Sequence, residues 1–127
     1  MPSAPSFQDL LDARLRVYGE MAPSALQRYP LLDQWVGCET WVKHENHNPT
    51  TAFKVRGGLN LVSRLSAEER ARGVVSASTG NHGQSIAYAS RAHGVPCTIV
   101  VSSSARARWP IRRSGDDSCR AMVSFTE

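Results

Sequence analysis

The chain has 127 residues, of which 41% are hydrophobic and 20% are charged, a size and composition typical of one small globular domain. It contains no run of about eighteen apolar residues, and residues 1–12 lack a basic stretch followed by an apolar core, so the sequence predicts neither a membrane span nor a secretory leader. We therefore expect a soluble, cytoplasmic protein. The formal net charge is +4, but much of the excess comes from arginines after residue 101, so nucleic-acid binding is the least favoured class of function.

Three cysteines, Cys38, Cys97 and Cys119, are spread along the chain without a Cys-x-x-Cys pair. Their spacing matches neither a disulfide framework nor a zinc site. We expect structural thiols and no metal.

The N-terminal third predicts a helix, a loop and a short strand. Ser6 and Asp9 stand three residues apart before apolar residues at helical spacing, which predicts a capped helix over residues 7–18. Residues 26–35 are broken by proline and predict a loop with a helical turn. Residues 39–43 alternate in character and predict a short strand.

A second helix is predicted over residues 53–65, and Thr50 or Thr51 can supply its cap. The residues expected to face the core are Phe53, Leu61 and Leu65. Two adjacent glycines, Gly57 and Gly58, are unfavourable inside a helix. Their presence indicates that another part of the backbone approaches closely there.

A capping box opens the next predicted helix, because Ser66 is followed three residues later by Glu69. This helix is short and is expected to end near Gly73. Residues 74–77 begin with two valines and predict a second strand, which we expect to be buried.

A longer helix is predicted over residues 80–93, ending at Gly94 in the usual C-terminal glycine position. The residues expected on its apolar stripe are Ile86, Ala89 and Ala92. A third strand follows over residues 97–101.

The alternation of strands and helices predicts an α/β fold, a partial three-layer domain with parallel strands and right-handed crossovers. Residues 102–127 are rich in serine and arginine, have weak periodicity and predict no third crossover helix. We therefore divide the chain into residues 1–101 and a divergent basic tail at residues 102–127.

Two segments of the sequence carry chemistry. Residues 43–58 read Lys-His-Glu-Asn-His-Asn-Pro-Thr-Thr-Ala-Phe-Lys-Val-Arg-Gly-Gly, and residues 76–84 read Ser-Ala-Ser-Thr-Gly-Asn-His-Gly-Gln. The first resembles the pyridoxal-phosphate attachment motif, and the second the substrate carboxylate loop, of fold type II pyridoxal-phosphate enzymes. Within this tryptophan synthase beta-like superfamily, the resemblance is to the threonine dehydratase and serine racemase group. It covers roughly residues 26–101 and implies the N-terminal part of such an enzyme.

The resemblance implies that Lys54 holds pyridoxal phosphate as a Schiff base. Such a lysine needs an amine that can be neutral near pH 7, which a buried, apolar helix start next to Phe53 would favour. The alternative for a lysine without this motif is a helix surface. By the same resemblance Phe53 lies against the cofactor ring, a role compatible with a place in the core.

The second motif follows a strand and opens a helix, where backbone N–H groups and the helix dipole attract an anion. The resemblance implies that a substrate carboxylate binds there, at Ser78, Thr79, Gly80, Asn81 and His82. Asn81 resembles the asparagine that hydrogen-bonds the 3-hydroxyl of the cofactor, with a helix cap as the alternative. For His82 we favour a loop residue that binds through its backbone over a metal ligand or general base.

Thr79 occupies the position at which racemases of this group carry a catalytic serine, an acid or base on the opposite face of the cofactor. Because threonine adds a methyl group, racemisation is a less favoured alternative to elimination, which needs only the lysine face. The implied activity is a lyase reaction in which Lys54 takes the α-proton of threonine or serine, loss of the β-hydroxyl follows, and a 2-oxo acid and ammonia result.

The family's glycine-rich phosphate loop and the partner of the ring nitrogen lie further along, in longer proteins. Because residues 102–127 do not match the family's continuation, we hypothesise a truncation or a frameshift near Val101. We expect weak or no pyridoxal-phosphate binding by this chain alone, and an inactive fragment or non-catalytic interaction module is the alternative to a lyase. The expected partner is a small-molecule amino acid, and full-length relatives are often homo-oligomers.

Overall fold

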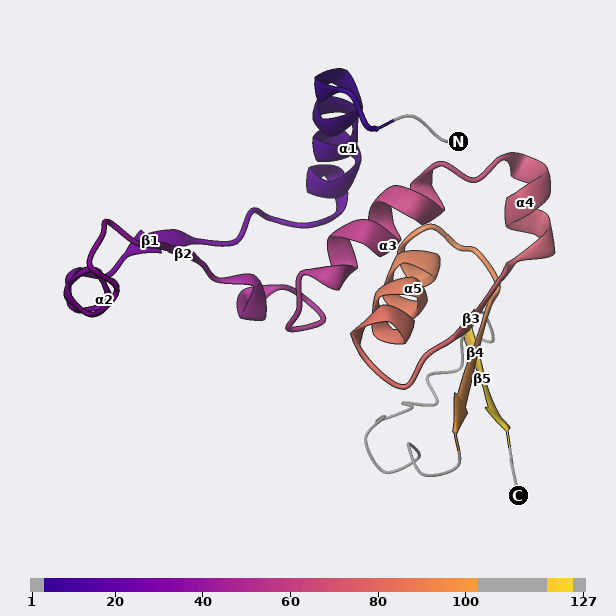
Figure 1. The fold of residues 1–127 in the computed structure, drawn as a ribbon. Coiled ribbons are helices and arrows are strands. Elements are labelled where there is room, and N and C mark those ends of the chain that lie inside the picture. Colours follow the sequence, from indigo (N-terminus) through magenta and orange to yellow (C-terminus); the bar gives the residue numbers. More distant parts are fainter. Residues whose placement is uncertain (1–3, 103–118, 125–127) are drawn as a thin grey trace.

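The computed structural model describes residues 4–102 and the backbone of residues 119–124. Figure 1 shows a stack in which α1 lies on α3, α3 on α5, and α5 on a small sheet, while β1, α2 and β2 extend to one side as an arm. The elements in chain order are α1 (Phe7–Glu20), β1 (Leu26–Arg28), α2 (Pro30–Val36), β2 (Trp41–Lys43), the 3-10 turn η1 (Glu45–His47), α3 (Lys54–Ser63), α4 (Ala67–Arg72), β3 (Val74–Ala77), α5 (Asn81–Ala92), β4 (Cys97–Ser102) and β5 (Cys119–Ser124).

Helix α1 begins where the sequence predicts. The Ser6 side chain accepts the backbone N–H of Asp9, and the Asp9 carboxylate accepts the backbone N–H of Ser6, so the predicted capping box is confirmed. The helix contributes Val17 and the following Met21 to the core. Arg16 ties α1 to α3 by a hydrogen bond of 2.8 Å to Asn60.

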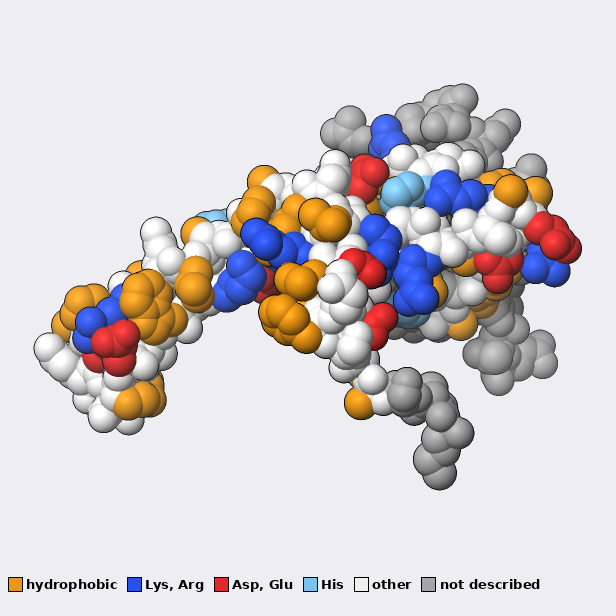
Figure 2. All heavy atoms as spheres, turned by 90° about the horizontal axis from the view of Figure 1, so that it is seen from above, with side chains coloured by type: hydrophobic (Ala, Val, Ile, Leu, Met, Phe, Trp, Pro, Cys, Tyr) orange, Lys and Arg blue, Asp and Glu red, His pale blue; other side chains and the backbone are white. Residues whose placement is uncertain are grey.

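The arm corrects the expectation that residues 39–43 join the parallel layer. Strand β2 pairs with β1 in a separate antiparallel ribbon, with Gln27 opposite Val42. Both strands are short and largely exposed. A buried parallel strand needs apolar residues on both faces, and β2 lacks them. Figure 2 shows orange hydrophobic surface on this arm, which includes Leu31, Trp35 and Trp41.

Helix α3 begins at Lys54, with Phe53 at the N-cap position and no side-chain cap, so the prediction of a threonine cap is wrong. The core-facing residues are also different from those predicted. Phe53 and Leu61 are 59% and 53% exposed, and Leu65 is only partly buried against the core. The buried side is formed by Val55, Gly58, Leu59 and Val62. This set follows the i, i+3, i+4, i+7 spacing of a packed helix face.

Helix α4 is confirmed, since Ser66 and Glu69 form the predicted capping box and Gly73 ends the helix with a positive φ of 78°. A β-carbon at Gly73 would also lie 2.7 Å from the carbonyl oxygen of Pro96. Two reasons therefore require glycine at this turn into the sheet: the positive φ of residue 73 and the close approach of the Pro96 backbone.

The parallel sheet has the strand order β3-β4-β5, and α5 covers one face of it. The sheet core consists of Ile86 from α5 with Cys97, Ile99 and Val101 from β4. Two burial predictions are wrong, because Val75 of β3 is 76% exposed and Ala92 of α5 is exposed. Val75 alternates with Val74, which packs against the core, and so lies on the other face of the strand. Ala92 lies in the last turn of α5.

Strand β5 was not predicted from the sequence. It pairs parallel to β4, with Cys119 opposite Cys97 and Ser124 opposite Ser102. Residues 103–118 and 125–127, which hold most of the predicted tail, lie outside the described residues. Within the described part of the chain, no helix combines the length and the apolar character needed to cross a membrane.

Candidate active site

Lys54 is the first residue of α3, and its side chain is exposed. The prediction of a buried helix start is wrong, because the neighbouring Phe53 is itself 59% exposed. The amine instead stands over the Phe53 ring, with Nζ 5.3 Å from the ring centroid. This contact is a surface cation–π pair. In this chain the lysine is therefore accessible to a molecule from solution.

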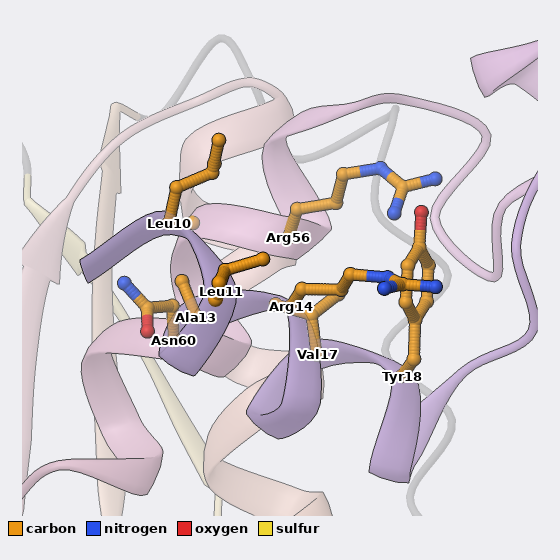
Figure 3. A pocket seen from close by; sticks show the side chains of 9 residues that line it. Leu10, Leu11, Ala13, Arg14, Val17, Tyr18, Arg56 and Asn60 are labelled. Carbon is orange, nitrogen blue, oxygen red and sulfur yellow. The ribbon is translucent and has the colours of Figure 1, made fainter. Parts of the chain in front are cut away.

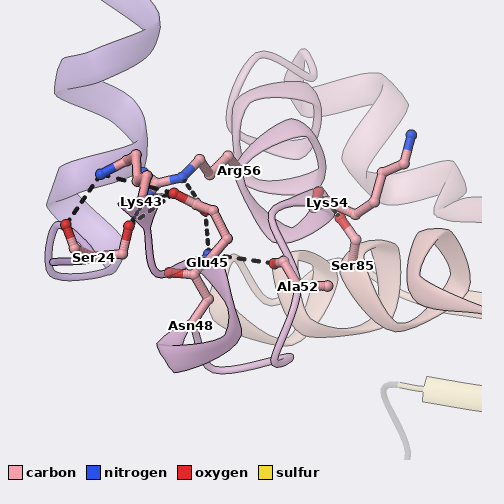
Figure 4. A network of polar contacts seen from close by, with 8 residues as sticks. All are labelled: Ser24, Lys43, Glu45, Asn48, Ala52, Lys54, Arg56 and Ser85. Atoms are coloured by element: carbon pink, nitrogen blue, oxygen red, sulfur yellow. Dashed lines mark hydrogen bonds and ion pairs between the residues drawn. The ribbon is translucent and has the colours of Figure 1, made fainter. Parts of the chain in front are cut away.

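The segment before Lys54 is held by a carboxylate with four hydrogen bonds (Figure 4). Glu45 accepts Ser24 Oγ at 2.8 Å, Arg56 Nη2 and Nε at 3.1 Å and 2.8 Å, and Asn48 Nδ2 at 2.5 Å. Asn48 is almost fully buried. The network joins η1, the segment after α1 and the first turn of α3, so it fixes how the chain enters the lysine helix.

The same network controls the ionisation of Glu45. The hydrogen bonds from Arg56, followed by those from Ser24 and Asn48, lower the pKa of Glu45 to about 2, although partial burial acts in the opposite direction. The pair also raises the pKa of Arg56. Both groups are therefore charged throughout the physiological range, and the ion pair is permanent.

The first turn of α3 is also bonded to α5. The hydroxyl of Ser85, a fully buried residue of α5, accepts the backbone N–H of Gly58 at 3.1 Å and donates to the carbonyl of Lys54 at 2.5 Å. Figure 4 shows Ser85 below this carbonyl, while the lysine side chain extends away from Arg56. Sequence reasoning did not identify Ser85.

Of the two adjacent glycines in α3, only Gly58 lies close to another part of the backbone. A β-carbon added at Gly58 would lie 2.6 Å from the backbone oxygen of Ser85, whereas one at Gly57 would meet no described atom within 4 Å. The predicted close approach is thus confirmed at Gly58, where α3 crosses α5.

The predicted carboxylate loop lies between β3 and α5. Ser78 donates its N–H to Val100 at 3.1 Å, and Gly80 donates its N–H to Ser78 Oγ at 3.3 Å. Gly80 is the N-cap of α5, with no side-chain cap bond, and Asn81 is the first helical residue. The alternative of Asn81 as a helix cap is therefore wrong. Thr79, Gly80, Asn81 and His82 are exposed, and Ser78 is half-buried.

The two predicted motifs converge because α3 packs on α5. Asn81 and Ser85 are four residues apart, so they lie on the same side of α5. Ser85 contacts the backbone of Lys54. The start of α5 therefore lies about one helical turn, roughly 5 Å along the axis of α5, from this contact. The start of α5, which the loop precedes, thus lies near the first turn of the lysine helix.

Thr51, three residues before Lys54, has a φ of 53°. This left-handed conformation is unfavourable for a β-branched residue. Because its side chain is exposed, Thr51→Gly should raise the free energy of unfolding by about 0.5–1 kcal/mol, the relief of strain exceeding the added chain entropy. Urea unfolding measures this change. Thr50→Gly is the control and should lower stability, since Thr50 has no positive φ to relieve. If Thr51→Gly is less stable than the wild type, the backbone at Thr51 is not strained.

A groove of about 490 Å³ runs between α1 and α3 (Figure 3). Its described lining residues are Leu10, Leu11, Ala13, Arg14, Val17, Tyr18, Arg56, Gly57 and Asn60. None of the predicted site residues lines it. We therefore do not assign the chemistry to this groove.

Comparison with known proteins identifies relatives of this arrangement. The family model described as "Pyridoxal-phosphate dependent enzyme" matches residues 17–123. The L-threonine ammonia-lyase of Thermotoga maritima is 40% identical over 96 residues, which are 76% of this chain and 24% of the relative. The L-threo-3-hydroxyaspartate ammonia-lyase of Saccharomyces cerevisiae is 40% identical over 105 residues, 81% of this chain and 32% of the relative.

A solved structure agrees with the fold. The serine racemase of Dictyostelium discoideum superposes with a TM-score of 0.79 at 26% identity, over 94% of this chain and 39% of that one. The chain thus spans about a quarter to two-fifths of the length of these relatives. The fold class and the resemblance predicted from residues 43–58 and 76–84 are confirmed, and the chain belongs to the family of pyridoxal-phosphate-dependent enzymes.

Proposed function

We propose that this chain supplies the lysine and the carboxylate loop of a pyridoxal-phosphate-dependent ammonia-lyase that acts on hydroxy amino acids such as threonine or serine. One observation carries the proposal. The amine of Lys54 is accessible, and the first turn of its helix, α3, is hydrogen-bonded to α5, the helix that begins directly after the carboxylate loop. The names of the two ammonia-lyase relatives support the reaction class.

The described residues fit the reactive end of the cofactor. They offer an exposed amine, an exposed aromatic ring beside it, and a helix N-terminus without a side-chain cap. Lys54 would hold the group, Phe53 would lie against its ring, and Asn81 would donate to its hydroxyl. The residues for its phosphate are expected in the part of the family's sequence that follows.

Each residue then has a defined task. When bound, pyridoxal phosphate supplies an electron sink for the charge that remains on the substrate after proton loss. Nζ of Lys54 would take the α-proton of the substrate. At the Ser78–His82 loop, the N–H groups of Ser78 and Gly80 already donate to Val100 and to Ser78 Oγ. The backbone N–H groups of Asn81 and His82, at the positive end of α5, would therefore bind the substrate carboxylate. Orientation by these two elements is the contribution of the protein.

Thr79 is the residue that would distinguish elimination from racemisation. It precedes the N-cap of α5 and is exposed, so it lies at the surface of the loop. A racemase needs a second acid or base opposite the lysine, and elimination does not. We place racemisation second, with formation of the D-amino acid from the L-form as its assay.

The test uses the fact that the chain has only two lysines, Lys43 and Lys54. The full chain is incubated with pyridoxal phosphate and reduced with borohydride, and the labelled lysine is located by peptide mass spectrometry. We expect the label mainly on Lys54, and its loss in Lys54→Ala but not in Lys43→Ala. Lys43 is a suitable internal control because its amine already donates to the Ser24 carbonyl at 3.1 Å. Equal labelling of both lysines would refute the proposal.

The remaining features are proposals about the whole protein. We propose that residues 1–101 form the enzyme-like part and residues 102–127 a divergent tail, that the protein acts in the cytoplasm on small-molecule amino acids, and that it forms homo-oligomers when complete. An inactive fragment or interaction module is the alternative. Production of a 2-oxo acid from threonine or serine with added cofactor separates a lyase from that alternative.

A further inference from the structure

Ser85 has two hydrogen bonds to one turn of a neighbouring helix. Its hydroxyl contacts the N–H of Gly58 and the carbonyl of Lys54, which are the i+4 and i groups that bond to each other in a regular α-helix. A side chain from α5 thus contacts both members of one backbone hydrogen-bond pair in the first turn of α3. Because Ser85 is fully buried, water does not replace it there.

This contact depends on the absence of a side chain at Gly58. A β-carbon at that position would lie 2.6 Å from the Ser85 carbonyl oxygen and 2.8 Å from its carbonyl carbon. The two helices therefore meet backbone to backbone, and the serine hydroxyl is the polar group at their crossing. Such a crossing leaves little freedom for sliding or rotation.

We propose that Ser85 is a positioning residue, which fixes the backbone of Lys54 relative to the carboxylate loop at the start of α5. The inference rests on the proposed function of Lys54. Ser85 touches neither substrate nor cofactor in this scheme and acts through the lysine backbone. Because Asn81 lies one turn earlier on the same side of α5, the hydroxyl couples the position of the amine to that of the loop.

Another buried serine of α5 provides a matched control. Ser90 is also fully buried, and its hydroxyl has no hydrogen-bond partner among the described residues. Ser85→Ala and Ser90→Ala each remove one buried hydroxyl from the same helix, but only the first removes contacts to α3. A purely structural effect of losing a buried hydroxyl would appear in both variants.

The first measurement needs no cofactor. With carbonyl-13C lysine, the full chain gives two lysine carbonyl signals in NMR, one from Lys43 and one from Lys54. We expect Ser85→Ala to shift the Lys54 signal and to leave the Lys43 signal unchanged, whereas Ser90→Ala moves neither. Ser85→Cys, with its weaker donor and acceptor, should give an intermediate shift and serves if Ser85→Ala does not fold.

The second measurement is the ratio of pyridoxal-phosphate labelling at Lys54 to that at Lys43. We expect Ser85→Ala to lower this ratio about fivefold, which corresponds to one lost hydrogen bond of ordinary strength, with Ser85→Cys between and Ser90→Ala as wild type. Two results would overturn the positioning role alone. One is a wild type that labels Lys54 preferentially together with a Ser85→Ala variant that does so equally well, and the other is a Lys54 carbonyl signal that does not shift in Ser85→Ala. A wild type that labels both lysines equally overturns the proposed function, and the positioning role with it.

Discussion

Replacing Gly58 with alanine is expected to lower the free energy of unfolding by about 2 kcal/mol. The added methyl group would overlap the backbone of Ser85, at 2.6 Å from its oxygen and 2.8 Å from its carbon, so α3 and α5 must move apart. This overpacking outweighs the gain of about 1 kcal/mol in helix propensity. Urea unfolding followed by circular dichroism measures the change.

Gly57→Ala is the matched control for this variant. It makes the same substitution one residue earlier, where no described atom lies within 4 Å of the new carbon, and should raise stability by about 0.5–1 kcal/mol. Adding Ser85→Gly to Gly58→Ala should not restore stability, because the clash involves the backbone of residue 85. A Gly58→Ala variant as stable as Gly57→Ala would show that the helices are not in contact at this point.

Much of the fold is predictable because its signals are local. The capping boxes at Ser6 and Ser66 and the glycines at 73 and 94 set helix ends by hydrogen bonds and backbone conformations within a few residues, and these predictions agree with the structure. The motifs at residues 43–58 and 76–84 are also local signals. Because each is a short continuous segment, the sequence alone identified the family.

The errors share a different cause, which is dependence on distant partners. Phe53 and Leu61 have the hydrophobicity of core residues, but the crossing of α3 with α5 selects Val55 and Leu59 instead. Residues 39–43 have a strand-like pattern that does not say which strand they pair with. Ser85 gave no signal of its own, because its function depends on two backbone groups of another helix. Its place four residues after Asn81 was the only available clue.

Glu45 shows how charge stabilises the approach to Lys54. Its carboxylate accepts four hydrogen bonds, and its side chain is 21% exposed, as is that of Arg56. Removing the charge leaves the guanidinium of Arg56 partly buried without its partner. Glu45→Gln should therefore lower the free energy of unfolding at pH 7 by about 2 kcal/mol, a value that allows for the partial exposure.

The pH dependence of stability is the sharper test of this network. The pKa of Glu45 is about 2 in the folded chain, against an ordinary value of 4.5. A carboxyl with a lowered folded-state pKa stabilises the fold fully above its unfolded pKa, and this contribution is lost as the pH falls from about 4.5 to about 2. The wild type should therefore lose about 2 kcal/mol more than Glu45→Gln across that interval, and the two stabilities should converge near pH 2.

Glu68→Gln is the control for charge removal alone. Glu68 is 85% exposed at the side chain, and its ion pair with Arg72 is long, at 4.0 Å. Its substitution should therefore change stability by less than about 0.5 kcal/mol. Unfolding curves at several pH values between 2 and 7 compare the three proteins. Parallel profiles for the wild type and Glu45→Gln would mean that the carboxylate is not held by Arg56. If the stability of the wild type approaches that of Glu45→Gln at low pH, while its difference from Glu68→Gln stays constant, the acid sensitivity of the lysine segment lies in the Glu45–Arg56 ion pair.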